Sequence, residues 1–68
     1  MKTFGRILKE LRKNKGLTQK ELAATLGVYK NTVGHWERGI CFPDILSASD
    51  LADILDVSLD TLVGRKPF

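Results

Sequence analysis

Apolar residues recur at helical spacing near the start of the chain. They fall at positions i, i+3, i+4 and i+7, as Phe4, Ile7, Leu8 and Leu11. Charged residues lie between them, so the segment predicts an amphipathic helix of about three turns. We expect this helix to end at Asn14–Gly16, because glycine readily adopts the left-handed conformation that follows a helix C-terminus.

A second, short helix begins with a clear capping signal. Thr18 is a favourable N-cap, and Glu21 completes a capping box, in which each side chain binds the backbone N–H of the other residue. The pattern predicts a helix over Gln19–Leu26, stopped by Gly27. A helix this short is unstable alone and has to be held by packing.

The third segment, from Tyr29 or Lys30 to about Arg38, has a mostly polar surface. Within it, Val33 and Trp36 point to a core. We expect Trp36 to anchor the core rather than to stack on bases, because it shares the apolar face with Val33. The segment predicts a helix that needs a polar partner to explain its outer face.

Two more helices complete the pattern. Pro43 suits a first helical position, and Asp44 complements the positive end of the helix that follows. Apolar residues then repeat at helical spacing, as Ile45, Ala48, Leu51, Ala52 and Leu55. Ser58 can cap a last short helix, whose apolar positions are Leu59, Leu62 and Val63. The sequence therefore predicts an all-α fold of five short helices in a single domain over residues 1–68, with residues 65–68 as a loose tail.

Length and composition narrow the class of protein. A chain of 68 residues forms one small domain, and 43% hydrophobic with 28% charged residues argues against disorder. Cys41 has no second cysteine to pair with, and His35 lacks the partners of a metal site. No triad, phosphate loop or apolar run of membrane-spanning length is present. We expect a cytoplasmic protein without metal, cofactor, membrane segment or enzymatic activity.

Charge is divided unevenly along the chain. The net charge is +3, but residues 1–38 contribute +6 and residues 39–68 contribute −3. Such a division suits a polyanion that meets one end of the molecule, although a solvated charged surface is a commoner cause.

The second and third helices are joined by a short connection with a glycine, as a helix-turn-helix requires. An ordinary helical hairpin fits this spacing equally well. Side-chain chemistry favours the first, because the outer face of the third helix carries groups that can bind base edges or phosphates: Lys30, Asn31, Thr32 and His35. No acidic residue lies between Glu21 and Glu37, and a carboxylate there would be repelled by phosphates.

The motifs LTQKELAATLGV, NTVGHWERG, FPD and LADILDVSLDTLVG resemble the Cro/cI-type helix-turn-helix family, also called the xenobiotic-response-element family of bacterial and phage regulators. The resemblance covers Phe4–Gly64. It implies a lambda-repressor-like domain that binds double-stranded DNA with its third helix in the major groove.

The resemblance also implies roles for individual residues, according to their positions in the matching motifs. Base reading is implied for Lys30, Asn31 and His35, with Thr32 beside them, and phosphate contact for Gln19 and Arg38. We add Lys20 and Tyr29 to the phosphate contacts. Arg12 and Glu37 match an ion pair that ties the first helix to the third in relatives. Tyr29 replaces a usual Ser or Thr cap, and Gly34 costs up to about 1 kcal/mol relative to Ala, so this helix is expected to be incompletely rigid.

We expect a transcriptional regulator, a repressor of phage or mobile-element type, that binds a palindromic operator as a homodimer. The expected dimer surface is Leu59–Phe68, with Leu62, Val63 and Phe68 as candidates. The alternative is an antitoxin-like or adaptor module that binds a protein partner, with DNA binding secondary; exposed Phe42 and Phe68 would favour it. The chain could also be the DNA-binding part of a longer repressor.

Overall fold

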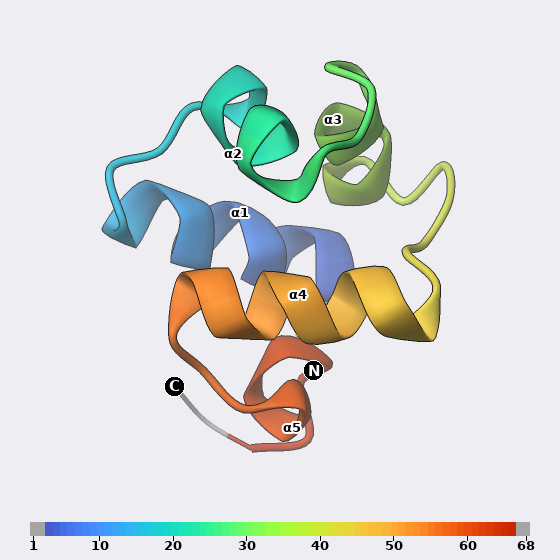
Figure 1. The fold of residues 1–68 in the computed structure, drawn as a ribbon. Coiled ribbons are helices and arrows are strands. Elements are labelled where there is room, and N and C mark those ends of the chain that lie inside the picture. Colours follow the sequence, from blue (N-terminus) through green and yellow to red (C-terminus); the bar gives the residue numbers. More distant parts are fainter. Residues whose placement is uncertain (1–2, 67–68) are drawn as a thin grey trace.

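The computed structural model describes residues 3–66, and within them it contains helices and no strand. The helices are α1 (Phe4–Asn14), α2 (Gln19–Leu26), α3 (Thr32–Glu37), α4 (Ile45–Leu55) and α5 (Leu59–Leu62). Figure 1 shows α1 at the centre, with α2 and α3 above it and with α4 and α5 below. The predicted all-α fold of five short helices is confirmed.

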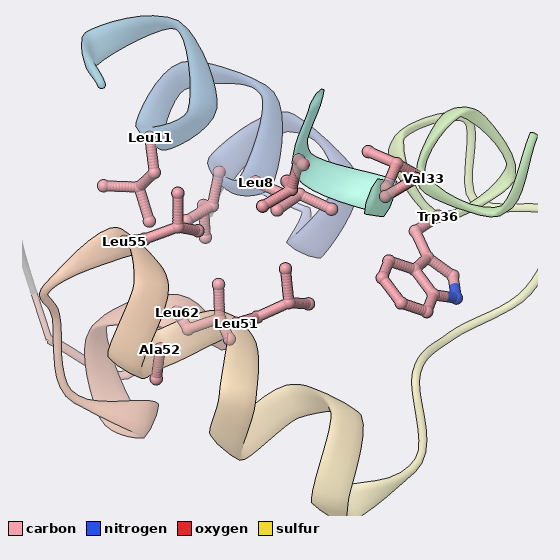
Figure 2. Packing of buried hydrophobic residues seen from close by; sticks show 11 residues of the cluster. Leu8, Leu11, Val33, Trp36, Leu51, Ala52, Leu55 and Leu62 are labelled. Carbon is pink, nitrogen blue, oxygen red and sulfur yellow. The ribbon is translucent and has the colours of Figure 1, made fainter. Parts of the chain in front are cut away.

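One core holds the helices together. α1 packs against α3 and α5, and α2 packs against α3 and α4. Figure 2 shows side chains from several helices converging on this core. It consists of Ile7, Leu8, Leu11, Leu22, Ala23, Val33, Trp36, Leu51, Ala52, Leu55 and Leu62. Trp36 is therefore the core anchor that the sequence predicts, and it fixes α3 from its inner side.

The start of α2 has the predicted capping box. Glu21 N–H donates to Thr18 Oγ1 (3.0 Å), and Thr18 N–H donates to Glu21 Oε1 (2.9 Å). The bonds from Thr18 lower the pKa of Glu21, because they favour its charged form. The cap therefore stabilises the fold above the pKa that Glu21 has when unfolded, and this contribution is lost as pH falls through the lowered value.

The beginning of α4 differs from the prediction. Asp44 is the N-cap, and its side chain accepts a hydrogen bond from Ser47 N–H (2.7 Å), so Pro43 lies before the cap rather than at the first helical position. Ile45 is 82% exposed, although its spacing predicts an apolar core position. The stripe of α4 that reaches the core begins one turn later, at the partly buried Ala48.

The C-terminal apolar residues are divided between the core and the surface. Leu62 is fully buried, so its predicted role in a dimer surface is wrong. Leu59 and Val63, at the two ends of the single turn of α5, are exposed instead. Phe68 lies outside the described residues.

The sequence predicts a loose tail over residues 65–68. The backbone N–H groups of Arg65 and Lys66 both donate to the carbonyl oxygen of Asp60, at 2.7 and 3.2 Å. Lys66 Nζ also lies 3.8 Å from Asp60 Oδ2. These two residues therefore fold back onto α5, and residues 67–68 lie outside the described part of the chain.

α1 and the end of α3 cross with almost no space between their backbones. A Cβ atom on Gly5 would lie 2.3 Å from the carbonyl oxygen of Glu37 and 2.8 Å from that of Trp36. Only a glycine fits at this crossing, since backbone atoms cannot move aside as a flexible side chain can. Gly5 thus sets the distance between α1 and α3.

We expect Gly5→Ala to lower the free energy of unfolding by at least about 2 kcal/mol, through overpacking against α3. A helical glycine replaced by alanine at an open position would instead stabilise the protein. Urea unfolding of the purified variant measures the difference, with Lys9→Ala, an exposed position of the same helix, as the control. An increase in stability for Gly5→Ala would contradict the close crossing.

Candidate nucleic-acid interface

α2 and α3 meet at a sharp corner. Gly27, in the left-handed conformation (φ 75°), ends α2, and Val28 N–H donates to the carbonyl oxygen of Ala23 (3.0 Å). Ala23 is buried, and its small side chain lets α3 pack closely across α2. The corner therefore has the helix-turn-helix arrangement.

The start of α3 differs from the prediction. The helix begins at Thr32 and ends at Glu37, whereas the sequence predicts a start at Tyr29 or Lys30. Thr32 N–H donates to the carbonyl oxygen of Tyr29 (2.9 Å), which forms a turn, and Asn31 gives no side-chain cap to the helix. Without a Ser or Thr cap at Tyr29, the chain turns once before α3 begins. Lys30 and Asn31 therefore precede α3 instead of lying within it.

The predicted DNA-contacting residues occupy one region, but in two groups. Five residues surround a surface recess between the start of α2 and the outer face of α3: Gln19, Asn31, Gly34, His35 and Arg38. Lys20, Tyr29 and Lys30 are exposed outside this recess, and Thr32 is partly buried. Base-reading and phosphate-contacting candidates thus lie together around the recess, and the remaining candidates flank it.

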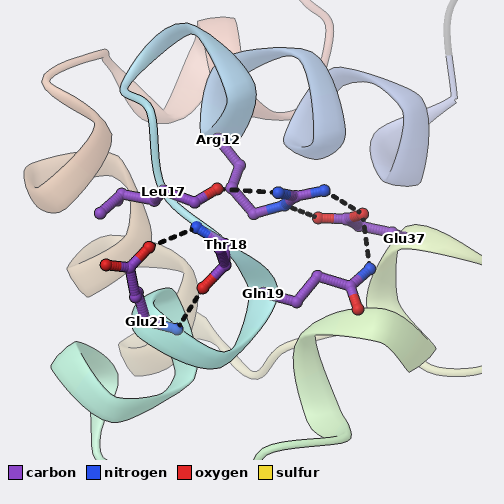
Figure 3. A network of polar contacts seen from close by, with 6 residues as sticks. All are labelled: Arg12, Leu17, Thr18, Gln19, Glu21 and Glu37. Carbon is purple, nitrogen blue, oxygen red and sulfur yellow. Dashed lines mark hydrogen bonds and ion pairs between the residues drawn. The ribbon is translucent and has the colours of Figure 1, made fainter.

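A polar network holds the start of α2 against the end of α3 (Figure 3). Arg12 of α1 donates to Glu37 through Nε to Oε2 (2.6 Å) and through Nη2 to Oε1 (3.2 Å). A third bond joins Arg12 Nη1 to the carbonyl oxygen of Leu17 (2.8 Å), and Gln19 Nε2 donates to Glu37 Oε1 (3.0 Å). The ion pair predicted between Arg12 and Glu37 is present in the structure, and it reaches one residue of the recess.

The ion pair between Arg12 and Glu37 is nearly buried, so the fold is sensitive to the loss of either residue. The side chains of Arg12 and Glu37 are only 10% and 4% exposed. Within residues 3–66, every buried side-chain nitrogen and oxygen has a hydrogen-bond partner. Loss of either charge would leave the other buried without compensation, which is far more costly than loss of an exposed pair.

The acidic residues of the C-terminal half do not line the recess. They lie on or beside α4 and α5: Asp44, Asp50, Asp53, Asp56 and Asp60. The bond from Ser47 N–H lowers the pKa of Asp44, so this carboxyl stays charged at its helix N-terminus. Among the described residues, those lining the recess include no carboxylate. An anion at the recess would therefore meet hydrogen-bond donors and the positive charge of Arg38.

Two features of the site could not be found from the sequence. The space beside Gly34 is filled by the Gln19 amide, and Glu37 binds that amide as well as Arg12. The only signal in the sequence is a glycine inside a helix, which indicates a special position but not the neighbour that requires it. Glu37 is therefore part of the site's support and not only of the ion pair between helices.

The described residues include no group of three or more His, Cys, Asp or Glu side chains placed to hold a metal ion. Over the same residues, no helix is long and apolar enough to cross a membrane.

Comparison with known proteins identifies the arrangement. Residues 8–62 match the family model HTH_3, described as helix-turn-helix. The uncharacterized HTH-type transcriptional regulator YazB of Bacillus subtilis is 39% identical over 59 residues, which cover 87% of this chain and 86% of YazB. The prophage-derived regulator YonR of the same organism is 38% identical, over 88% of this chain and 56% of YonR. The chain spans about half the length of several other regulators that it matches.

Solved structures give the same result for the fold. The biofilm regulator SinR, crystallised in complex with DNA, is 36% identical with a TM-score of 0.81, over 88% of this chain and 97% of that one. The P22 c2 repressor in complex with a synthetic operator has a TM-score of 0.90 at 24% identity, over 97% and 100% of the two chains, and shows the likeness of fold alone. The predicted lambda-repressor-like fold is confirmed.

We expect Glu37→Ala to lower the free energy of unfolding by about 3 kcal/mol, because it leaves the buried Arg12 guanidinium without a counter-charge. The matched control is Arg6→Ala, which removes an exposed ion pair with Glu10 and should cost less than about 1 kcal/mol. Urea unfolding of both variants compares the two pairs. Equal losses would show that the Arg12–Glu37 pair does not hold α1 to α3.

Proposed function

The chain belongs to the Cro/cI-type helix-turn-helix family, and from this we propose that it is a sequence-specific DNA-binding transcriptional regulator that represses by occupying an operator. The observation that carries the proposal is the carboxylate-free recess between α2 and α3. Its donors lie on one surface, and the five Asp residues of the C-terminal half lie on or beside α4 and α5.

In the proposed complex, α3 lies in the major groove. Lys30, Asn31 and His35 reach base edges, with Thr32 beside them. The start of α2 faces the DNA backbone, where its exposed N–H groups favour a phosphate. Phosphate contacts come from Gln19, Lys20, Tyr29 and Arg38.

The size of the domain supports a two-fold dimer. Its longest dimension is 28 Å, less than the distance of about 34 Å between successive major-groove half-sites on one face of DNA. One copy therefore reads one half-site, and a palindromic operator takes two copies. With Leu62 buried, Leu59 and Val63 are the large apolar side chains of the described C-terminal part that remain exposed for the contact.

The phage or mobile-element origin rests on similarity to the prophage-derived regulator YonR. A second candidate function, binding of a protein partner as an antitoxin or adaptor, is favoured by one observation. Phe42 is 67% exposed, next to the exposed Ile40, and its ring meets that of Phe4 edge-on at 6.1 Å. The absence of a carboxylate from the lining of the recess favours the regulator over this candidate.

Selection of bound sites from random duplex DNA tests the function. We expect enrichment of a palindrome whose half-sites are centred about 34 Å apart. Enrichment of a single half-site would contradict the dimer and leave the regulator. No enrichment at low salt would contradict DNA reading and favour the protein-interaction module.

We expect Asn31→Ala and Lys20→Ala to weaken DNA binding in different ways. Asn31→Ala should relax the preference at one base pair and cost about 1–3 kcal/mol on the selected site. Lys20→Ala should weaken binding to every sequence and reduce the slope of log affinity against log salt by about 0.9. Binding titrations on matched and mismatched duplexes at several salt concentrations measure both. A uniform loss for Asn31→Ala, or an unchanged slope for Lys20→Ala, would reject the role assigned to that residue.

A further inference from the structure

Gly34 lies where the outer face of α3 meets the first residue of α2. A Cβ atom on Gly34 would be 3.2 Å from Gln19 Oε1 and 3.7 Å from both Gln19 Cδ and Nε2. Apart from the adjacent residues and the backbone of α3 itself, these three atoms of the amide are the nearest heavy atoms to that position. The Gln19 amide therefore lies directly beside the position that a side chain at residue 34 would occupy.

The chemistry of Glu37 fixes which way this amide points. A carboxylate paired with an arginine only accepts hydrogen bonds, so the nitrogen of the Gln19 amide has to face it. The amide oxygen then faces Gly34, as the distances show. One N–H of Gln19 Nε2 is bound to Glu37, and the amide nitrogen carries a second N–H that can donate elsewhere.

The amide could move away from a new side chain only by changing its geometry to Glu37, whose own position is fixed. Its partner Glu37 is nearly buried and is bound twice by Arg12. A Cβ atom at 3.2 Å is closer than an ordinary van der Waals contact, so the amide would have to shift by a few tenths of an ångström. Such a shift would strain or break the 3.0 Å bond from Gln19 to Glu37.

We infer that Gly34 is a positioning residue for DNA binding: it leaves the space in which Glu37 orients the Gln19 amide, with the second N–H available to a DNA phosphate. The inference rests on the proposed function, because the phosphate is that of the bound operator. It explains why a glycine stands inside a short helix, where it disfavours the helical conformation.

A double-mutant cycle on the selected operator duplex tests the inference. We expect Gly34→Ala to lower the affinity about tenfold, the size of one hydrogen bond, and to lower it by less than about twofold in a Gln19→Ala background. If Gly34 only gives clearance against the groove, the loss will be the same in both backgrounds. If Gly34 only makes α3 less rigid, Gly34→Ala will raise the affinity, because alanine favours the helical conformation before DNA binds. Either result would overturn the inference.

A measurement without DNA separates this inference from the proposed function. In the free protein, the side-chain NH₂ resonances of Gln19 report its bond to Glu37, and we expect them to shift in Gly34→Ala while the core resonances stay in place. Unchanged Gln19 resonances would overturn the inference. Failure of the wild-type protein to select any duplex would defeat the proposed function and the phosphate contact, but the orientation of the amide would still be decided by these spectra.

Discussion

The ion pair between Arg12 and Glu37 determines how the surface around the recess between α2 and α3 is held. It joins α1 to the end of α3, binds the carbonyl oxygen of Leu17 in the connection to α2, and reaches the side chain of Gln19. α3 has only six residues and could not be stable alone. Its position depends on this buried pair, on the close crossing at Gly5, and on Trp36 in the core.

The small core and the polar network have separate effects. The apolar side chains supply the burial that folds a chain of 68 residues, but burial is non-directional and does not orient an amide. Hydrogen bonds to a fixed carboxylate do so, because they depend on both distance and angle. Orientation at the proposed interface therefore comes from Glu37, and cohesion comes from the residues around Leu8 and Leu22.

Sequence patterns predicted the helices well where the apolar spacing or a cap was strong, as at Thr18 and Glu21. They failed where a turn competes with a helix, because nothing in the spacing shows that the chain turns at Asn31 before α3 begins. They also failed for Ile45, since period alone does not say which turn of a helix reaches the core. Leu62 is in the core, as its apolar position in the last helix allows, and only its assignment to a dimer surface was wrong. The candidate members of the site come from the resemblance and from side-chain chemistry, and the structure places Gln19, Asn31, His35 and Arg38 around one recess. Their supports at Gly5 and Gly34 depend on contacts between distant segments, which the sequence does not display.

The inner and outer faces of α3 use different residues. Val33, Trp36 and Glu37 attach the helix to the domain, and His35 lies on the outer face with Asn31 before it. Substitutions on the outer face therefore leave the attachment intact. A lineage that carries this domain can change the molecule it recognises by small steps without first losing a folded protein, and Gly34 with Gln19 is the place where that freedom is most restricted.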